Sequence, residues 1–497
     1  MARTDVLFIH PGNQQRTYQG LANEFTAIAP PVWTSLLAHA VRRNGYTVRI
    51  YDVNVEGWDE RVPSELITRH DPALVVIMVY GHHPSASTQT MPAAGRIARD
   101  FKHSNPDIPV AMGGPHPSAL PERTLQEESV DFVVRGEGLS AILGLVRQVR
   151  GIGDLADVSG LSYRGKAEIA HTKDAVLISD LDQELDGYAW DLLPSLNRYR
   201  AHTMHCFQDF NKSRIKDFSD VRTPYLTMQT SLGCPYACSY CSSNAIFGKP
   251  GIRYWSLDTV MQWIDTAVTT YGVRTIRLDD ELFILSPERV ERFCDLLIER
   301  AYGLNLWVYG RVDTIGKTLL RKLKLAGVNW ICLGIESGNE RVRNQVNKQL
   351  RSDIREVVRS VQDHGISVLG NFMFGLPEDD AHTMEETLQL ALSLKSEFVN
   401  FYTVMAYPGS ELYAKVAGKK GYLPDGWEGF SQHGYDTRPL PTNSLKAADV
   451  LAFRDAAFHR YFTDPAYQSM IESRFGPSVL QHIHRMLAVP MRRRLLE

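Results

Sequence analysis

Residues 225–241 read YLTMQTSLGCPYACSYC, and this stretch decides the fold. Residues 225–229 are apolar and β-prone, which predicts a short strand. The strand runs directly into a loop that carries Cys234, Cys238 and Cys241 in the spacing C-x3-C-x2-C. In proteins that alternate strands and helices, loops at the carboxyl ends of parallel strands carry the functional groups. We therefore expect the functional site to lie around these cysteines.

The chain has six cysteines, and three of them fall between positions 234 and 241. Three closely spaced cysteines do not suit a disulfide framework, because the spacing is too tight and an odd number cannot pair completely. A loop of this length can wrap three thiolates around one corner of a cubane iron–sulfur cluster and leave the fourth iron open to substrate. Zinc normally takes four protein ligands, and no second cysteine pair follows. The spacing thus favours a cluster with one open iron.

Downstream of the cysteines, strand and helix patterns alternate. The strand at 225–229 is followed by five more apolar runs, at 275–278, 306–309, 330–333, 368–374 and 398–404. Helical spacing separates them, for example at 257–270, 287–300 and 353–364. The pattern predicts a partial (β/α)6 TIM-type barrel over 223–416, with its working face at the carboxyl ends of the strands. Residues 417–497 are predicted to form a mostly helical carboxy-terminal domain.

Upstream, residues 1–150 have a second alternating pattern. The predicted strands are 5–10, 46–51, 73–80, 110–112 and 132–134, and the helices 32–43, 88–102 and from 139 onward. This predicts an α/β, doubly wound, flavodoxin-like domain. Its strand-end loops read HPGN, YGHHP, GGPHP and RGEG, and they lie where such a domain binds its ligand. Residues 151–222 lose the pattern and are predicted to be a connecting segment.

Composition excludes several classes of protein. The 497 residues are 44% hydrophobic and 22% charged, which excludes a small disulfide scaffold and wholesale disorder. The formal net charge of −3 gives no indication of a nucleic-acid partner. The amino terminus lacks a signal-peptide core, and no apolar run reaches membrane-spanning length. We expect a cytoplasmic protein with no integral membrane segment and no nucleic-acid partner.

The cysteine motif, with Tyr240 just before its last cysteine, resembles the signature of the radical S-adenosylmethionine (SAM) superfamily. The likeness extends over 223–415 through LDDELF (278–283), LGIESGNERV (333–342) and GNFMFGLPEDD (370–380). It implies that Cys234, Cys238 and Cys241 hold a four-iron four-sulfur (4Fe-4S) cluster and that SAM chelates the fourth iron. It also implies reductive cleavage of SAM to a 5′-deoxyadenosyl radical and a reducing partner such as flavodoxin or ferredoxin.

The same resemblance implies positions for the SAM contacts. Asp280 and Glu281 would lie near the methionine moiety, and Glu336 would contact the ribose or the amino group. The backbone around Gly375 would lie against the adenine, and Arg311 would pair with the SAM carboxylate or with a neighbouring acid.

Alternatives stay open at these positions. Residues 279–281 could cap the following helix, because acidic residues are favoured at helix amino termini. Gly375 and Pro377 could be turn residues alone. For Glu336 we favour function, because a carboxylate at the end of an apolar strand is costly unless it is paired.

The upstream domain, with GGPHPSALPE and VVRGEG, resembles the cobalamin-binding domain of the cobalamin-dependent radical SAM class. The likeness implies that Gly113 and Gly114 let the backbone approach the corrin or its nucleotide tail. His82, His83 and His116 would approach the cobalt or the corrin amides, although each could instead be a structural loop histidine. Gly136 and Glu137, in the RGEG loop, are further predicted cobalamin contacts. A flavodoxin-like domain without corrin is the alternative.

In classical cobalamin domains the cobalt is bound by the histidine of a D-x-H-x-x-G motif after the first strand. Here that loop reads HPGNQQRTYQG and lacks the motif. The nearest match, DVNVEG at 52–57, has Asn54 in place of the histidine and follows the second strand, so we interpret it as a chance match. We therefore expect a weak or water ligand at the lower axial position.

The combined resemblance implies a cobalamin-dependent radical SAM enzyme that works anaerobically. We favour a C-methyltransferase that acts on an unactivated carbon of a small-molecule or lipid intermediate. The alternatives are a non-methylating cyclase or oxidoreductase of the tetrapyrrole cyclase type, a methylthiotransferase, and a non-catalytic iron–sulfur or corrin sensor. No catalytic side chain is predicted.

Overall fold

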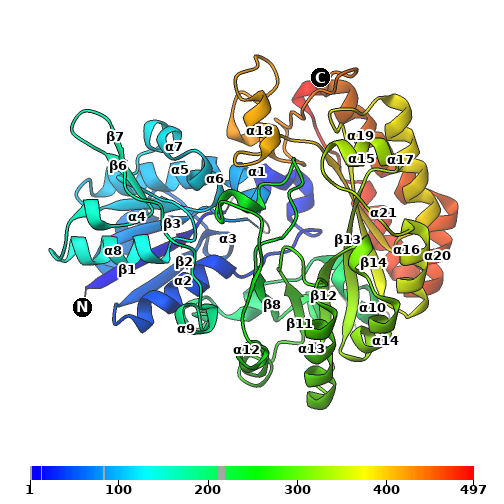
Figure 1. Cartoon of the computed structure of the whole chain (residues 1–497), viewed down its shortest axis with the longest axis horizontal. Coiled ribbons are helices and arrows are strands. Elements are labelled where there is room, and N and C mark those ends of the chain that lie inside the picture. The colour runs from blue at the N-terminus through cyan, green and yellow to red at the C-terminus, as the bar shows by residue number, and fades with distance from the viewer. Residues whose placement is uncertain (1–2, 13, 82–83, 211–218) are drawn as a thin grey trace.

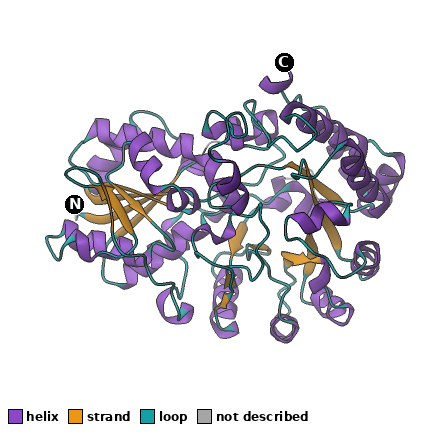
Figure 2. Ribbon diagram, turned by 45° about the horizontal axis from the view of Figure 1, so that its top comes forward, coloured by secondary structure: helices purple, strands orange, loops and turns teal. Residues whose placement is uncertain are grey.

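The structure is a computed structural model of the chain, and it describes residues 3–12, 14–81, 84–210 and 219–497 (Figure 1). Two sheets lie side by side, each covered by helices (Figure 2). In Figure 1 the blue and cyan amino-terminal half is on the left, and the green to red remainder is on the right. No helix in the described residues is long and apolar enough to cross a membrane.

The first sheet has seven strands in the order β2-β1-β3-β4-β5-β6-β7. The parallel strands are β1 (Thr4–His10), β2 (Val48–Asp52), β3 (Pro72–Met78), β4 (Val110–Gly113) and β5 (Phe132–Val134). Alternate residues of β1 pack into opposite layers: Val6 and Phe8 lie in the layer of α2 (Val32–Arg43) and α8 (Leu139–Val149). Leu7 and Ile9 lie in the layer of α5 (Ser87–Ser104), near α4 (Val62–His70). Burial on both faces explains the uninterrupted apolar strands. The doubly wound fold is confirmed.

Two strands of this sheet come from the segment that the sequence pattern left as a connection. β6 (Leu161–Arg164) pairs antiparallel with β5, and β7 (Ile169–His171) pairs antiparallel with β6. A short hairpin at a sheet edge needs no crossover helix, so it leaves no alternating helix signal in the sequence. The predicted connecting segment therefore contains a hairpin over 161–171 that the sequence pattern did not indicate.

The second sheet is an open half-barrel of six parallel strands in the order β15-β14-β13-β12-β11-β8. Its strands are β8 (Tyr225–Met228), β11 (Thr275–Leu278), β12 (Asn305–Arg311), β13 (Val328–Glu336), β14 (Ser367–Phe374) and β15 (Phe398–Thr403). The helices between them are α12 (Leu257–Thr269), α13 (Pro287–Arg300), α14 (Lys317–Leu325), α16 (Ile354–Asp363) and α17 (Ala381–Leu394). The predicted partial barrel is therefore confirmed. β9 (Ser231–Leu232) and β10 (Arg253–Tyr254) form a separate antiparallel pair.

The carboxy-terminal region is helical, with α19 (Ala447–Phe462), α20 (Pro465–Phe475) and α21 (Pro477–Leu487). α19 packs against β15, and the 3-10 turn Trp427–Phe430 packs against α5 of the first domain. The carboxy-terminal region therefore contacts both sheets' domains. The remaining short helices are α1 (Gln14–Tyr18), α3 (Val53–Glu56), α6 (Pro115–Ala119), α7 (Pro121–Glu127), α9 (Leu181–Glu184), α10 (Phe207–Phe210), α11 (Ser219–Arg222), α15 (Glu340–Gln345) and α18 (Glu411–Val416).

Candidate functional site

The cysteine loop begins just after β8, between β9 and β10. Gly233 precedes the first cysteine with φ 92°, and a Cβ there would collide with the carbonyl oxygen of Gly251. The Gly251 N–H donates to the Cys234 carbonyl at 3.0 Å, and the Cys241 N–H donates to the Cys238 carbonyl at 3.0 Å. Backbone contacts therefore hold the loop in a folded turn, with its cysteines at the mouth of the half-barrel.

The three thiols lie close enough to act on one another. Burial, together with the neighbouring Cys241 and Cys238, raises the pKa of Cys234 to about 11. Burial also raises the pKa of Cys241, whose Sγ donates to the Ser243 hydroxyl at 3.2 Å. No three or more His, Cys, Asp or Glu side chains in the described residues converge on a single metal ion. A cubane needs no such convergence, because each thiolate binds a different iron. The donor set therefore fits a cluster.

The acidic residues that follow β11 hold the backbone of this loop. Asp280 is buried and accepts hydrogen bonds from the Thr230 N–H at 3.1 Å and the Thr230 hydroxyl at 2.9 Å. Glu281 Oε2 accepts from the Gly233 N–H at 3.1 Å. Burial raises the pKa of Asp280 to about 6 and that of Glu281 to about 7. The following helix is capped by Ser286, so the helix-cap interpretation is wrong.

Glu281 has spare capacity for a ligand. Its Oε1 is buried and has no hydrogen-bond partner among the described residues. Asp279, by contrast, forms an ion pair with Arg277, with Nη2 2.8 Å from Oδ2. Asp279 and Asp280 therefore have partners within the protein. Glu281, in contrast, has one oxygen that is free to accept a hydrogen bond from a donor beside Cys234.

Glu336 ends β13 in a strained conformation. Its φ of 68° lies in the left-handed region, which costs a non-glycine residue about 1–3 kcal/mol. Its buried carboxylate pairs with Lys348, with Nζ 3.1 Å from Oε1. The pKa of Tyr240 is raised by burial, by Glu336 and by Cys238, which places all three near one another. A strained, paired carboxylate beside the cysteine loop is consistent with the predicted cofactor role.

Arg311 and Gly375 are held by neighbouring residues of the chain. Arg311 pairs with Asp313, with Nε 2.9 Å from Oδ1, and its guanidinium lies 3.9 Å from the centre of the Tyr236 ring. The neighbouring acid is therefore its partner in this structure. The Gly375 N–H donates to Asp379 Oδ2 at 3.0 Å, and its φ is 87°. This is the geometry of a turn, as the alternative interpretation supposed.

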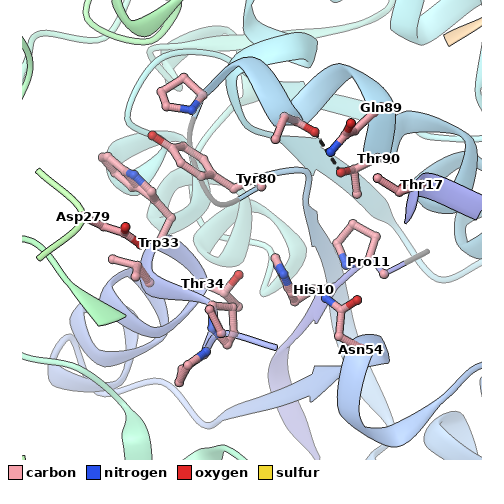
Figure 3. Close-up of a pocket in the computed structure, with 18 of the residues that line it drawn as sticks. His10, Pro11, Thr17, Trp33, Thr34, Asn54, Tyr80, Gln89, Thr90 and Asp279 are labelled. Carbon is pink, nitrogen blue, oxygen red and sulfur yellow. Dashed lines mark hydrogen bonds between the residues drawn. The ribbon is translucent and has the colours of Figure 1, made fainter. Parts of the chain in front are cut away.

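A cavity lies between the two domains and is lined by residues from both (Figure 3). The first domain contributes His10 at the end of β1, Asn54 after β2 and Tyr80 after β3. The half-barrel contributes Gln229 and Asp279, together with Glu281. Two cofactors carried by the two domains would meet a substrate in this space.

Three of the described cobalamin candidates, Gly113, Gly114 and His116, have contacts elsewhere in the first domain. His116 is buried, its Nδ1 lies 3.2 Å from the Thr88 hydroxyl, and its ring packs edge-on against Trp427. Gly114 has φ 128° at the start of α6, where a Cβ would collide with the Val79 carbonyl. A Cβ on Gly113 would press on Met78 and Val134. These described candidates are not among the residues that line the cavity. His82 and His83 lie outside the described residues.

The RGEG loop connects the two domains. Glu137 is buried and pairs with Arg253 of β10, with Oε1 2.6 Å from Nη2. It also accepts from the Ile178 N–H at 2.8 Å. The Gly136 N–H donates to the Ser118 hydroxyl at 3.0 Å. The structure therefore gives Glu137 a role in joining the domains, which the prediction of a cobalamin contact did not include.

Most of the residues that line the cavity were not predicted as site residues, among them His10, Trp33, Asn54, Tyr80 and Gln229. His10 and Tyr80 open the quoted loops HPGN and YGHHP, so the strand-end rule contained a signal for them. Asn54 belongs to the DVNVEG stretch that we interpreted as a chance match. Trp33 lies within α2 and stacks near Tyr80, with ring centres 5.5 Å apart. Only the packing of α2 on the sheet brings it to the cavity.

Comparison with known proteins agrees with this architecture. Residues 18–146 match the model of the B12 binding domain, and residues 228–391 match that of the radical SAM superfamily. The chain is 27% identical over 404 residues to an uncharacterized methyltransferase of Pyrococcus horikoshii, covering 81% of this chain and 82% of that protein. It is 26% identical over 471 residues to the anaerobic magnesium-protoporphyrin IX monomethyl ester cyclase of Rubrivivax gelatinosus, covering 93% and 78%.

A solved structure shows the same fold. The radical SAM methyltransferase TsrM of Kitasatospora setae, solved with cobalamin and a 4Fe-4S cluster, matches with a TM-score of 0.67 and 17% identity. The match covers 94% of this chain and 90% of TsrM. One chain thus carries both matched domains in the order predicted from its sequence, and it belongs to the cobalamin-dependent radical SAM enzymes.

Proposed function

We propose that this enzyme transfers a methyl group to an unactivated carbon of a small-molecule or lipid intermediate. The observation that carries the proposal is the shared cavity, which is lined by the strand ends of both domains and continues toward the cysteine loop through Glu281. The methyltransferase relative from Pyrococcus horikoshii supports it. When bound, the cluster supplies the electron that cleaves SAM, and the corrin carries the methyl group.

The residues of the chain bind and orient. Cys234, Cys238 and Cys241 would hold the cluster and leave one iron open to SAM. Glu281 presents an unpartnered oxygen beside Cys234, and the Glu336–Lys348 pair lies near Tyr240. These side chains would receive the polar groups of SAM.

The cavity gives the substrate a mostly uncharged surface. Trp33 and Tyr80 provide aromatic area, while Gln229 has a buried amide oxygen that accepts no hydrogen bond from the described residues. Hydrophobic walls with a few placed polar groups are typical of small-molecule sites. We therefore propose a substrate with an apolar body and at least one hydrogen-bond donor.

The reductant and compartment follow from the same chemistry. All six cysteines are free thiols, and cluster ligands must stay reduced before iron binds. We propose that the enzyme works in the reducing, anaerobic cytoplasm, with flavodoxin or ferredoxin as the electron donor.

A ring-forming cyclase is the second candidate, because the Rubrivivax relative covers nearly the whole chain. A methylthiotransferase fits less well, since that class usually carries a further cysteine trio upstream, and only Cys206 precedes Cys234. A non-catalytic sensor would bind the cofactors without cleaving SAM.

One experiment separates these functions. The protein is reconstituted anaerobically with iron, sulfide and hydroxocobalamin, and its absorption spectrum is recorded. It is then incubated with SAM, reductant and extracts of small molecules and lipids. Methylation predicts a product heavier by one CH2 unit, with S-adenosylhomocysteine and 5′-deoxyadenosine formed in equal amounts. A cyclase would form 5′-deoxyadenosine without S-adenosylhomocysteine. Absence of both compounds would contradict the enzyme assignment.

A further inference from the structure

His10 is the last residue of β1, and β1 lies between β2 and β3 in the first sheet. The side chain is only 8% exposed, yet it lines the cavity. Its Nδ1 is buried and has no hydrogen-bond partner among the described residues. Figure 3 shows the imidazole projecting into the middle of the pocket, between Thr34 and Pro11. A buried nitrogen without a partner costs about 1–3 kcal/mol, so a retained one needs an explanation.

His116 provides the contrast within the same domain. Both imidazoles are buried, and burial lowers the pKa of His10 to about 4 and that of His116 to about 3, so both rings are neutral near pH 7. His116, however, bonds to Thr88 and packs against Trp427, away from the cavity. Of these two histidines, only His10 offers a free lone pair or N–H to a ligand in the cavity.

The place of His10 suits a flat macrocycle. A strand-terminal residue is fixed by the hydrogen bonds of its neighbours, and β1 pairs with β2 up to His10 itself, opposite Asp52. Thr34 has a buried hydroxyl, and Gln14 a buried amide oxygen, that lack partners among the described residues and also line the cavity. A cofactor with a metal centre and peripheral amides would give a partner to the imidazole of His10 and, at the same time, to the Thr34 hydroxyl and the Gln14 amide oxygen. The residues present therefore fit a corrin.

We propose that His10 provides the axial nitrogen ligand to cobalt on the face of the corrin that meets the first sheet. This rests on the proposed function only in requiring bound cobalamin. It revises the expectation of a weak or water ligand, which considered only the D-x-H-x-x-G position and the histidines of later loops. Neutral imidazole is the form that binds metals, so burial keeps His10 ready to bind at neutral pH.

Electron paramagnetic resonance of the Co(II) form of the full-length protein tests this. A nitrogen on the axis splits each cobalt line into a triplet. Protein labelled with ¹⁵N only in histidine, loaded with unlabelled cobalamin, should give a doublet instead. His10→Ala should lose the protein-derived splitting while His116→Gln keeps it.

Each other result overturns the proposal. A triplet that ignores histidine labelling would identify the benzimidazole of cobalamin as the ligand. Absence of nitrogen splitting would indicate water or no ligand, and would leave His10 at most a hydrogen-bond partner of the corrin. A doublet that survives His10→Ala would assign another histidine. Because the labelled wild-type protein is measured directly, the test does not depend on the His10 variant folding.

Failure of the proposed function would look different. A full-length protein with an intact cluster and no cobalamin absorption would overturn both the axial ligand and the methyl-transfer proposal. Methylation with water as the axial ligand would overturn the His10 proposal alone.

Discussion

The two sheets present their carboxyl ends to one cavity, but the two edges differ in chemistry. The barrel edge carries thiols, Glu281 and the Glu336–Lys348 pair, and the Gly233 N–H holds Glu281 in place. The edge of the first domain is neutral, with His10, Asn54 and Tyr80 drawn from separate strand ends. A cluster needs specific ligands at fixed spacing, whereas a large neutral cofactor is bound by shape and dispersed polar groups. This explains why the barrel edge has a recognisable sequence motif and the edge of the first domain does not.

The largest effect should come from the thiols. Single Cys234→Ala, Cys238→Ala and Cys241→Ala variants should lose SAM cleavage entirely, because two thiolates cannot hold the open-iron cubane. Formation of 5′-deoxyadenosine after anaerobic reconstitution measures this. Cys294→Ser, in the buried face of α13, should keep the cluster spectrum. Cleavage at the wild-type rate in any of the three variants would contradict the barrel edge described above.

The second largest effect should come from the ion pair between Glu137 of the first domain and Arg253, which joins the two domains. Arg253→Met would leave Glu137 buried without its cation, and we expect a loss of about 3 kcal/mol in unfolding free energy. Urea denaturation, followed by tryptophan fluorescence, measures it. The matched control is Lys317→Met, which breaks an exposed pair with Glu356 and should cost less than about 0.5 kcal/mol. Equal effects would show that Glu137 does not join the domains.

The smallest expected effects are pH dependences of opposite sign at the two edges. The pKa of Glu281 rises from 4.5 to about 7, so the folded state holds a proton that the unfolded chain has lost; its contribution to stability is lost as pH rises through that window. The pKa of His10 falls from 6.5 to about 4, so its contribution is lost as pH falls through that window.

Urea midpoints between pH 4 and pH 8 test this second comparison, with a change in stability of at most about 1.4 kcal/mol per pH unit expected from each group. Glu281→Gln should remove part of the decline toward high pH, and His10→Gln part of the decline toward low pH. Thr34→Val, which changes the same cavity without a titratable group, should leave the shape of the profile unchanged. If Glu281→Gln and His10→Gln change the pH profile of the urea midpoint in the same direction, the two edges do not differ in the sign of their pH dependence.

Periodicity and motifs were enough to predict the fold class and both matched domains, and they point to Cys234, Cys238 and Cys241 as the predicted cluster ligands. Apolar periodicity records which residues are buried, and Cys234, Cys238 and Cys241 could be predicted as a set because they lie close together in one short loop. The hairpin of β6 and β7 was missed because two short edge strands leave little periodic signal. Glu336 was predicted, but its left-handed backbone and its pairing with Lys348 were not.

The residues that share the cavity could be identified only from the packed fold. His10, Trp33, Asn54, Tyr80 and Gln229 come from five separate segments and meet because parallel strands end at common edges and the two sheets face each other. It also separated His10 from His116, two histidines in similar strand-end loops, since a side chain's partners depend on the helices packed around it. Spacing along the chain encodes local ligand sets, whereas a site built between domains depends on packing, which no single stretch of sequence records.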